Sequence, residues 1–361
     1  MGRNLFRKAF DDGTLDKLEI FEDYFKEWLP VFISRQEIIW KEIQIFDFFA
    51  GEGTDINGIY GSPMRIVSIL SKNKILIEKS KVKIKVVVNE FDKEKFDLLK
   101  TNLLSIADET MYTIEFHNND FIKVFDLYYT SMKQTANFLF LDQNGIKQIT
   151  EEVFGKLIGL RQTDFIFFIS SSYIKRFSEV EEFNKYLKIT KQDLEGKSYY
   201  HIHRVVLEYY RTKIPIGKKY FLAPFSIKKP SGIYGLIFGT NHTLGIEKFL
   251  QVCWKHDKLT GEANFDIDNE KIDLHNLGMF SEYNTPSKKQ VFDTSLKDKI
   301  FKKELKTDLE VYLFTLNEGF LLKDSNAILK ELKKDGKINF EFKTYNFDLH
   351  KIKNHSEIKI N

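Results

Sequence analysis

The sequence contains little cysteine, proline or glycine, and each shortage excludes a class of protein. Its 361 residues include one cysteine, 6 prolines and 19 glycines. The single thiol of Cys253 can form neither a disulfide within the chain nor a zinc site of the Cys-x-x-Cys type. The low share of glycine and proline excludes a linker-rich or low-complexity chain. With 42% hydrophobic and 15% aromatic residues, the chain can instead bury a large core.

Long apolar runs and a strong excess of one charge are also missing. The longest apolar stretches, such as Phe165–Ile169, have strand length and fall far short of the roughly 20 residues that span a bilayer. The amino terminus soon reaches Asp11 and Asp12 and lacks the apolar run of a signal peptide. We therefore expect a soluble, cytoplasmic protein. The formal net charge of +3 alone indicates neither a histone-like nor a strongly acidic partner.

What is present is an alternation of short apolar runs and helical stretches. The expected strands are Ile43–Phe49, Ile84–Val88, Tyr112–Phe116, Phe138–Leu141 and Phe165–Ile169, and expected helices are Pro63–Leu70, Lys93–Leu104 and Thr150–Arg161. This alternation predicts a Rossmann-like α/β fold, with a mostly parallel sheet and helices on both faces. Lys219–Leu222 and Ile233–Phe238 are expected to close the sheet as an antiparallel pair. The loop between them would hold Pro224 and Pro230.

The expected elements divide the chain into four parts. Residues 1–36 form a helical segment, with apolar residues at helical spacing over 15–33 and Pro30 ending or bending the helix. Residues 37–254 form the sheet domain, with a helical insertion at 173–215. The polar stretch 255–298 is expected to be a linker. Residues 299–361 show two helices, a glycine turn and a strand, which is the pattern of a winged helix.

The positive charge of the chain is concentrated near its carboxyl end. Residues 285–361 contain 16 lysines and 12 acidic residues, whereas the whole chain has a net charge of only +3. Two interpretations are open: these lysines contact nucleic acid, or they form an ordinary solvated surface.

Glycines and carboxylates follow the first three predicted strands. The segment Asp47–Gly53 contains Asp47, Phe49, Ala50, Gly51 and Gly53, and its glycines allow a close approach of the backbone to a ligand. Glu90 closes the second strand, where a carboxylate suits the hydroxyls of a ribose. Asp120 closes the third strand, where it could bind an adenine amino group. Because ligands bind at this edge of a parallel sheet, the three positions would hold a methionine moiety, a ribose and an adenine.

Each of these residues also has an ordinary structural interpretation. Asp47–Gly53 could be a plain strand-to-helix turn, and Glu90 and Asp120 could cap the helices that follow them. Ser62 is expected to be the N-cap of a helix with Pro63 in its first position. One turn further along, Arg65 could meet a carboxylate or a phosphate. Two other polar residues, Asp55 and Asn57, could line a pocket. His201 and His203 alternate, but no third ligand is evident, so no metal site is expected.

These motifs resemble those of class I S-adenosylmethionine-dependent methyltransferases, and in particular the three-Cys-motif partner (TcmP) family. The resemblance spans roughly residues 14–340 and is carried by KLEIFEDYFKEWLPVF, IFDFFAGEGT, GSPMRIVSIL, FLFLDQNG and IYGLIFGTNHTLGIEKFLQVCW. The resemblance implies S-adenosyl-L-methionine as cofactor and a partner protein with a three-cysteine motif. It also implies that Asp47, Ala50, Gly51 and Gly53 belong to the cofactor motif, followed by Gly61, Ser62 and Pro63.

The same resemblance implies Asp142 and Asn144 as the catalytic residues. They lie in the segment that in the family reads Asp-Pro-aromatic-Gly, but here Gln143 stands in place of proline and Asn144 in place of the aromatic residue. Amino-group methyltransferases stack that aromatic ring on a flipped base. Here the stacking would need Tyr173 or Phe177.

Three functions therefore remain open, of which methyl transfer to a protein or a small molecule has no sequence feature for or against it. The other two can be compared. The first is methyl transfer to a nucleic acid, at nitrogen rather than at C5 of cytosine. The C5 reaction needs a cysteine nucleophile, and Cys253 lies in a predicted helix far beyond the fourth strand. The second is a catalytically inactive subunit that binds S-adenosylmethionine and acts as a specificity or scaffold subunit for its partner. The replaced proline and aromatic residue favour the second class.

Overall fold

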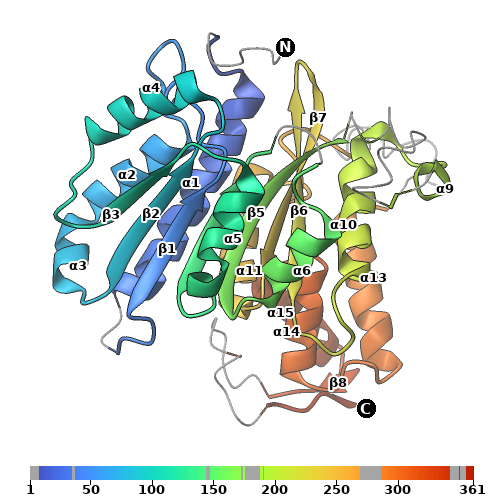
Figure 1. The fold of residues 1–361 in the computed structure, drawn as a ribbon. Coiled ribbons are helices and arrows are strands. Elements are labelled where there is room, and N and C mark those ends of the chain that lie inside the picture. Colours follow the sequence, from blue (N-terminus) through green and yellow to red (C-terminus); the bar gives the residue numbers. More distant parts are fainter. Residues whose placement is uncertain are drawn as a thin grey trace. The chain divides into compact units, whose positions relative to one another are not determined.

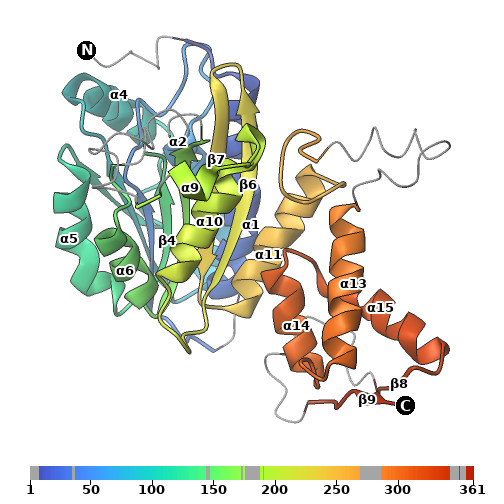
Figure 2. The same cartoon turned by 90° about the vertical axis from the view of Figure 1, so that its right-hand side faces the viewer.

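The computed structural model describes residues 8–34, 37–143, 147–171, 174, 188–189, 191–268, 286–341, 349 and 355–361. The chain divides into two units, Met1–Asn241 and His242–Asn361. Figures 1 and 2 show the elements of both units from two directions.

The first unit is built around a seven-stranded sheet of order β3-β2-β1-β4-β5-β7-β6 (Figure 1). Its strands are β1 (Glu42–Asp47), β2 (Lys83–Asn89), β3 (Thr113–His117), β4 (Ala136–Leu141), β5 (Gln162–Ser170), β6 (Phe221–Lys229) and β7 (Gly232–Thr240). Strands β1 to β5 are parallel, and β7 runs antiparallel to both of its neighbours, β5 and β6. The predicted mostly parallel sheet, closed by an antiparallel pair, is confirmed.

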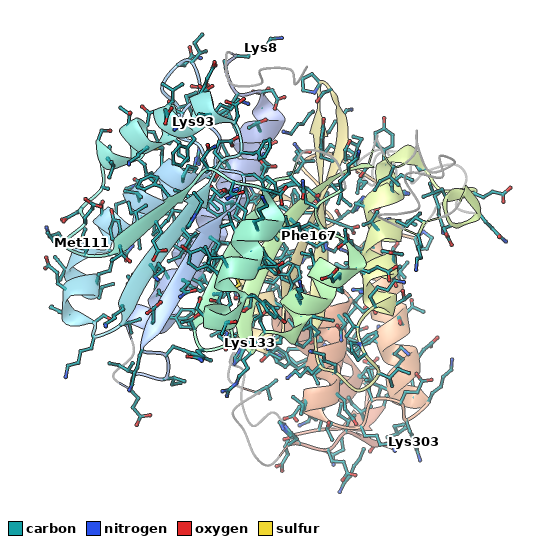
Figure 3. The ribbon with its side chains drawn as sticks, in the orientation of Figure 1. Lys8, Lys93, Met111, Lys133, Phe167 and Lys303 are labelled. Carbon is teal, nitrogen blue, oxygen red and sulfur yellow. The ribbon has the colours of Figure 1, made fainter. Side chains whose placement is uncertain are left out.

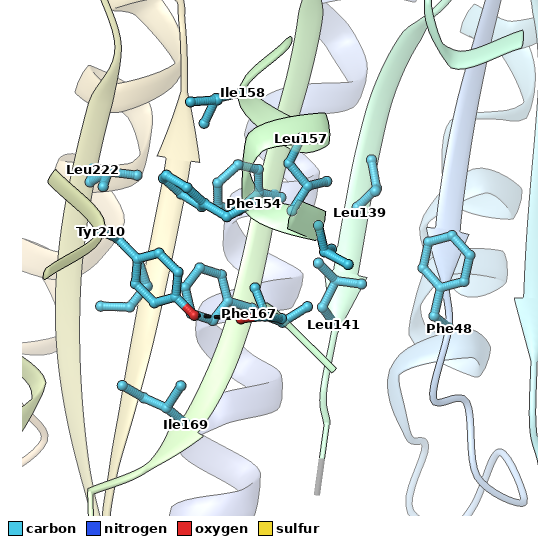
Figure 4. Close-up of a cluster of buried hydrophobic side chains, with 14 of the residues drawn as sticks. Phe48, Leu139, Leu141, Phe154, Leu157, Ile158, Phe167, Ile169, Tyr210 and Leu222 are labelled. Carbon is cyan, nitrogen blue, oxygen red and sulfur yellow. Dashed lines mark hydrogen bonds between the residues drawn. The ribbon is translucent and has the colours of Figure 1, made fainter. Parts of the chain in front are cut away.

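Helices cover both faces of this sheet. They are α1 (Asp12–Ile33), α2 (Ser62–Lys72), α3 (Lys74–Lys79), α4 (Lys93–Leu104), α5 (Phe121–Met132), α6 (Glu151–Gly159), α9 (Lys191–Leu194), the short 3₁₀ helix η2 (Tyr199–His201) and α10 (Ile202–Thr212). All residues of β4 are buried. Its Phe140 packs on Phe21 of α1, with ring centroids 4.3 Å apart. The next residue, Leu141, belongs to the cluster that α5, α6 and α10 cover on the other face (Figure 4). This double burial explains why the parallel strands are continuously apolar.

Helix α1 begins slightly before the predicted stretch 15–33 and ends with it. Asp11 is the N-cap and accepts a hydrogen bond from the Thr14 N–H at 2.7 Å, so the helix begins before residue 15. The helix also continues past Pro30 to Ile33, and the Ser34 N–H still bonds to the Pro30 carbonyl. Pro30 therefore lies inside the last turn.

The pair that closes the sheet also differs from its prediction in one respect. Pro224 lies within β6 and not in the loop, which is formed by Pro230 and Ser231. Strand β6 is at the edge of the sheet. A proline is tolerated there because an edge strand has backbone N–H positions without a neighbouring strand.

Surface and interior are clearly separated in the first unit. Figure 3 shows Lys93 and Lys133 at its periphery, whereas Phe167 of β5 lies in its interior. No helix among the described residues is long and apolar enough to cross a membrane.

The described part of the second unit contains helices and a two-stranded sheet. Its elements are α11 (Thr243–His256), α13 (Lys288–Phe301), α14 (Asp308–Asn317), α15 (Leu322–Lys334), β8 (Ile338–Asn339) and β9 (Lys359–Ile360). Strands β8 and β9 pair antiparallel. Within the unit, the Trp254 indole donates to the Gly319 carbonyl at 2.9 Å, and the Tyr312 hydroxyl donates to Glu247 at 2.7 Å. These bonds attach α11 to the helices that follow it.

The division between the units differs from the predicted organisation. It falls after Asn241, whereas the sheet domain was expected to end at 254. Helix α13 begins within the expected linker, where Ser287 and Gln290 form a capping box. Two helices were expected here, over 309–322 and 325–334, and two are found. The first, α14, ends at Asn317 because Gly319, with φ +79°, follows it, and α15 begins three residues earlier than expected.

Replacing Gly239 by alanine should destabilise the first unit. Gly239 pairs with Phe165 across β7 and β5, and a Cβ there would lie 2.2 Å from the Phe165 ring. That ring is fully buried and cannot move aside. We expect Gly239→Ala to cost about 1–3 kcal/mol of unfolding free energy, measured by urea denaturation.

The matched control for this substitution is Gly155→Ala. Gly155 lies in α6, and nothing lies within 4 Å of a Cβ built there. Alanine should stabilise the helix at this position by about 0.5–1 kcal/mol. If Gly239→Ala were as stable as Gly155→Ala, the close packing of β7 on Phe165 would be refuted.

Candidate functional site

The loop after β1 places two glycines at the carboxyl-terminal edge of the sheet. Gly51 and Gly53 have φ values of +64° and +88°, a region that favours glycine. Three hydrogen bonds fix the loop. The Ala50 N–H donates to the Asn89 carbonyl, the Asn102 amide donates to the Glu52 carbonyl at 2.9 Å, and the Gly61 N–H donates to the Gly53 carbonyl at 2.7 Å. The backbone of this loop is therefore held in one conformation.

Glu90 faces this glycine loop. Its carboxylate accepts hydrogen bonds from the Gly51 N–H and the Asp92 N–H, both at 2.9 Å. The structure thus brings together two residues that the sequence analysis assigned to one site. Glu90 does not cap α4, because the cap is Asp92, which accepts from the Lys95 N–H.

Asp120 takes the capping role that was its structural alternative. It is the N-cap of α5 and accepts from the Ile122 N–H at 2.9 Å through Oδ1. It lies beside the loop after β2, because the Asn118 side-chain amide donates to the carbonyls of Glu90 and Phe91 at 2.8 and 2.9 Å. Asp120 is therefore at the expected edge, with one carboxylate oxygen already used.

Two residues of this edge were missed by the sequence analysis. Asn89 is buried, donates to the carbonyls of Phe48 and Asn119, and accepts from the Asn119 N–H, each at 3.1 Å. It joins the loops after β1 and β3. Phe91, directly after Glu90, is 74% exposed. An amide that ends a buried apolar strand and an aromatic residue beside the acidic one were the available signals.

Asp47 is a fully buried carboxylate behind the glycine loop. Its Oδ1 accepts from the Phe49 N–H at 3.4 Å, and its Oδ2 has no hydrogen-bond partner among the described residues. Burial is the main cause that raises the pKa of Asp47 to about 7. The Ser62 hydroxyl opposes this shift, and the negative charge of Asp142 adds to it. A buried acceptor without a partner can bind a cation or a hydrogen-bond donor of a ligand.

The other predicted residues of the glycine motifs lie around Asp47. Phe49 packs against the Phe121 ring at 5.3 Å, and Ala50 is buried. Ser62 is not the helix cap, since Gly61 is the N-cap of α2 and Ser62 and Pro63 are its first residues. This shift leaves the Ser62 hydroxyl close enough to Asp47 to affect its pKa.

Arg65 and Asp55 have structural partners. Arg65 forms an ion pair with Glu22 of α1 and donates to the Tyr60 carbonyl at 2.9 Å. The Asp55 carboxylate accepts from three backbone N–H groups, those of Phe10, Asn57 and Ile59, at 2.8–2.9 Å. Burial would raise the pKa of Asp55, but these donors outweigh it and lower the pKa. Its carboxylate therefore folds the 54–60 loop.

Asp142, which was expected to be catalytic from the sequence, forms an ion pair with Lys17 of α1. The next residue, Gln143, is buried and spans the loop. Its amide donates to the Phe168 carbonyl at 3.1 Å, and its oxygen accepts from the Gln148 N–H at 2.9 Å. The Gln143 side-chain amide is therefore bound at both ends by backbone groups of Phe168 and Gln148. Asn144, Gly145, Tyr173 and Phe177, which were expected on this side from the sequence, lie outside the described residues.

Cys253 and the histidines contribute no site in the described part of the chain. Cys253 is buried in α11, and burial raises the pKa of its thiol well above the ordinary range. His203 is buried in α10. The described residues hold no group of three or more His, Cys, Asp or Glu side chains that could bind a metal ion.

Comparison with known proteins gives one family match and several similar structures. The profile of the GMT-like wHTH domain family matches residues 264–344. No curated protein matches the sequence. The predicted Rossmann-like, mostly parallel sheet is confirmed, and the family match confirms the predicted winged-helix domain.

Three solved structures illustrate the similarity. Trm1 from Pyrococcus horikoshii, in complex with S-adenosyl-L-methionine, is 12% identical, with a TM-score of 0.40 over 72% of this chain and 65% of that chain. An O-methyltransferase from Bacillus cereus, in complex with SAH, is 12% identical, with a TM-score of 0.34 over 64% and 92% of the two chains. TomG from Streptomyces achromogenes, an O-methyltransferase in complex with SAM, is 9% identical, with a TM-score of 0.34 over 65% and 92%.

Replacing Asp47 by asparagine should stabilise the fold at alkaline pH. The fold raises the pKa of Asp47 from 3.8 to about 7, so it favours the protonated carboxyl. That contribution to stability is fully present below about pH 4 and is lost as pH rises through about 7. Asp47→Asn should therefore increase the unfolding free energy at pH 8 by up to roughly 4 kcal/mol and change it little at pH 4. Urea denaturation at both pH values measures this.

The matched control is Asp55→Asn, whose effect should have the opposite sign. The fold lowers the pKa of Asp55, so it favours the ionised carboxylate. Asp55→Asn should therefore lose stability at pH 8. A loss of stability at pH 8 in Asp47→Asn would contradict the assignment of Asp47 as a strained, buried acid.

Proposed function

We propose that this protein is an S-adenosylmethionine-dependent methyltransferase that acts on nucleic acid. The observation that carries the proposal is the position of Glu90, whose carboxylate lies on the Gly51 N–H with the exposed Phe91 beside it. A carboxylate at the end of the second strand suits the hydroxyls of a ribose, and an exposed aromatic ring beside it suits a base. These are the features that a nucleoside requires. The resemblance of the sequence to class I methyltransferases supports the same cofactor.

Each residue at this edge would contact a different part of the cofactor. The loop that contains Gly51 and Gly53 would contact the methionine moiety. Glu90 would accept hydrogen bonds from the ribose hydroxyls, and Phe91 would stack on the adenine. The free oxygen of Asp120 is available for the adenine amino group. When bound, S-adenosylmethionine supplies an electrophilic methyl group on a sulfonium ion.

Asp142 would contact the methyl acceptor, and the second unit would by itself bind nucleic acid. Asp142 has one oxygen on Lys17, and its other oxygen can accept a hydrogen bond from the acceptor. Winged helices commonly bind nucleic acid, and α15 carries exposed Lys323, Lys330 and Lys334 at spacings that place them on one face. Lysines on one helix face suit the phosphate backbone. Rate enhancement would come mainly from orientation.

A second candidate function is that of an inactive subunit that binds the cofactor for a partner. Gln143 favours it, because its side chain is used to hold the loop to β5 and offers nothing to an acceptor. The resemblance to the TcmP family adds the proposal of a partner protein with a three-cysteine motif. Methyl transfer should therefore be measured with the chain alone and with such a partner co-expressed. Cofactor binding without transfer in either case would favour the inactive subunit.

Calorimetry with S-adenosylhomocysteine tests the cofactor site. Wild-type chain should bind it, and Glu90→Gln and Phe91→Ala should each weaken binding by about 10-fold or more, because the first removes a charged hydrogen-bond acceptor and the second removes a stacking ring. Glu94→Gln, on the exposed first turn of α4, is the matched control and should bind normally. Absence of binding to wild-type chain would remove the proposal. Transfer from labelled cofactor to bulk DNA and RNA then tests the reaction.

The salt dependence of nucleic-acid binding tests the role of α15. A triple variant with Lys323, Lys330 and Lys334 changed to glutamine should bind duplex DNA more weakly. The slope of log affinity against log salt should become shallower by about 0.9 for each phosphate that the variant no longer neutralises. The control variant changes Lys72, Lys79 and Lys93, exposed lysines of the first unit, and has the same net charge. Equal slopes for the two variants would show that α15 does not bind phosphates.

A further inference from the structure

Lys17 of helix α1 binds Asp142, the residue expected to contact the methyl acceptor. Its Nζ atom donates to Oδ2 of that carboxylate and lies 5.0 Å from the centre of the Phe168 ring. The Lys17 side chain is 10% exposed, whereas the Asp142 side chain is 31% exposed. The ammonium group is therefore enclosed, and the carboxylate that it binds is partly open to solvent.

A regular step between helix α1 and strand β4 places Lys17. Phe25 packs on Phe138 of β4, with ring centroids 5.7 Å apart. One turn earlier in α1, Phe21 packs on Phe140 at 4.3 Å. Four helix residues rise about 6 Å and two strand residues about 6.6 Å, so the next step along both elements brings Lys17 to the carboxylate that it binds. The aromatic packing of α1 on β4 therefore determines which α1 side chain meets this carboxylate.

The ion pair lies beside the glycine loop. Strands β1 and β4 are neighbours in the sheet, with Asp47 paired to Phe140, and Asp142 follows two residues later. The Phe48 N–H, at the start of the glycine loop, donates to the Phe140 carbonyl at 3.4 Å. Burial is the largest cause that raises the pKa of Asp47. The negative charge of Asp142 adds to that effect, and the positive charge of Lys17 opposes it. Both charges are thus close enough to act on a carboxyl group behind the loop.

Stability alone does not account for a lysine at this position. An ammonium group that leaves water loses free energy of hydration, and one ion pair often fails to offset that loss. An apolar side chain of similar length could pack between α1 and the Phe168 ring without this cost. The effect that only a cation has here is to fix one oxygen of Asp142. The other oxygen has no hydrogen bond to a residue that the structure describes, and a carboxylate oxygen is an acceptor.

We propose that Lys17 is a positioning residue, which holds one oxygen of Asp142 so that the other is left to orient the methyl acceptor. This inference rests on the proposed methyltransferase function. The acceptor N–H or O–H donates to the free oxygen, which aligns a lone pair of the acceptor atom with the methyl carbon. That lone pair forms the bond to carbon, the carbon–sulfur bond breaks, and its electron pair stays on sulfur. The acceptor proton is lost to bulk water. Lys17 acts only through Asp142.

The position of the Lys17 charge can be tested without cofactor or acceptor. In the full chain labelled with ¹³C at the aspartate carboxyl groups, the NMR signal of Asp47 is identified by its loss in Asp47→Asn. The pKa of Asp47 is about 7 in the wild-type chain. It should be higher in Lys17→Met, because this variant lacks a nearby positive charge and keeps the negative charge of Asp142. The same pKa in both proteins would show that the ammonium group does not lie beside the glycine loop and would overturn the proposal.

Methyl transfer to bulk DNA and RNA tests the positioning role itself. Lys17→Met should lower kcat by about 100-fold, while the KM for S-adenosylmethionine and the affinity for S-adenosylhomocysteine are kept. Lys17→Arg retains a cation with N–H donors and should recover part of the lost rate. Because Lys17 acts through Asp142, the double variant of Lys17→Met and Asp142→Ala should be no slower than Asp142→Ala alone. Fully additive losses in the double variant would contradict the proposal.

The matched control removes another polar bond between α1 and the sheet. The Tyr24 hydroxyl donates to Asp164 of β5 at 2.6 Å, two turns along α1 from Lys17. Tyr24→Phe should lower the unfolding free energy in urea denaturation and leave kcat unchanged. If Tyr24→Phe and Lys17→Met lowered kcat equally, the loss would come from the attachment of α1 to the sheet, and Lys17 would not be a positioning residue.

The outcomes separate this inference from the proposed function. If wild-type chain transfers methyl groups and Lys17→Met does so equally well, Lys17 does not position Asp142, and the methyltransferase proposal still stands. If wild-type chain binds S-adenosylhomocysteine but labels no nucleic acid, alone or with its partner, both the nucleic-acid reaction and the role of Lys17 are refuted. If it binds no cofactor, the proposed function fails at its first step.

Discussion

The hydrogen bond from the Gly51 N–H to the Glu90 carboxylate is the contact on which the arrangement of this edge depends. It joins the loop after β1 to the end of β2. The three residues Asn89, Glu90 and Phe91 then divide three tasks: the first binds backbone groups in the interior, the second binds the glycine loop, and the third is exposed to solvent. The segment 89–91 thus both holds the backbone of the glycine loop in place and exposes the Phe91 ring to solvent.

Helix α1 provides or covers the positive charge that the carboxyl ends of the parallel strands lack. The carboxyl ends of the parallel strands carry mostly carboxylates and amides, whereas the buried positive charge at this edge comes from Lys17 on α1 and from Lys229, which α1 covers. The same helix is bonded to strand β5 through Tyr24, whose hydroxyl donates to the buried Asp164 at 2.6 Å. The amino-terminal segment is therefore part of the site and not an appendage of the sheet domain.

This sequence predicts the helices and strands more successfully than the side-chain contacts between distant residues. Apolar periodicity reports burial, so it identified the parallel strands and gave α4 its observed bounds, Lys93–Leu104. It missed α13 because that helix is polar, although the capping pair Ser287 and Gln290 was present as a signal. The position of Glu90 beside the glycine loop was predicted because the carboxyl ends of parallel strands lie at one edge of the sheet. The Lys17–Asp142 pair was not found, because no local pattern encodes a contact between residues so far apart in the chain.

The separation in sequence between α1 and its partners has a consequence for biosynthesis. The Tyr24–Asp164 bond spans 140 positions, and the Lys229–Thr14 bond spans 215. Helix α1 leaves the ribosome long before β6, on which its first turn packs, has been made. Until then the aromatic face of α1, including Phe21, Tyr24 and Phe25, has no complete surface to pack against. The nascent chain therefore exposes this face through most of the synthesis of the first unit, and its folding depends on long-range contacts that form slowly.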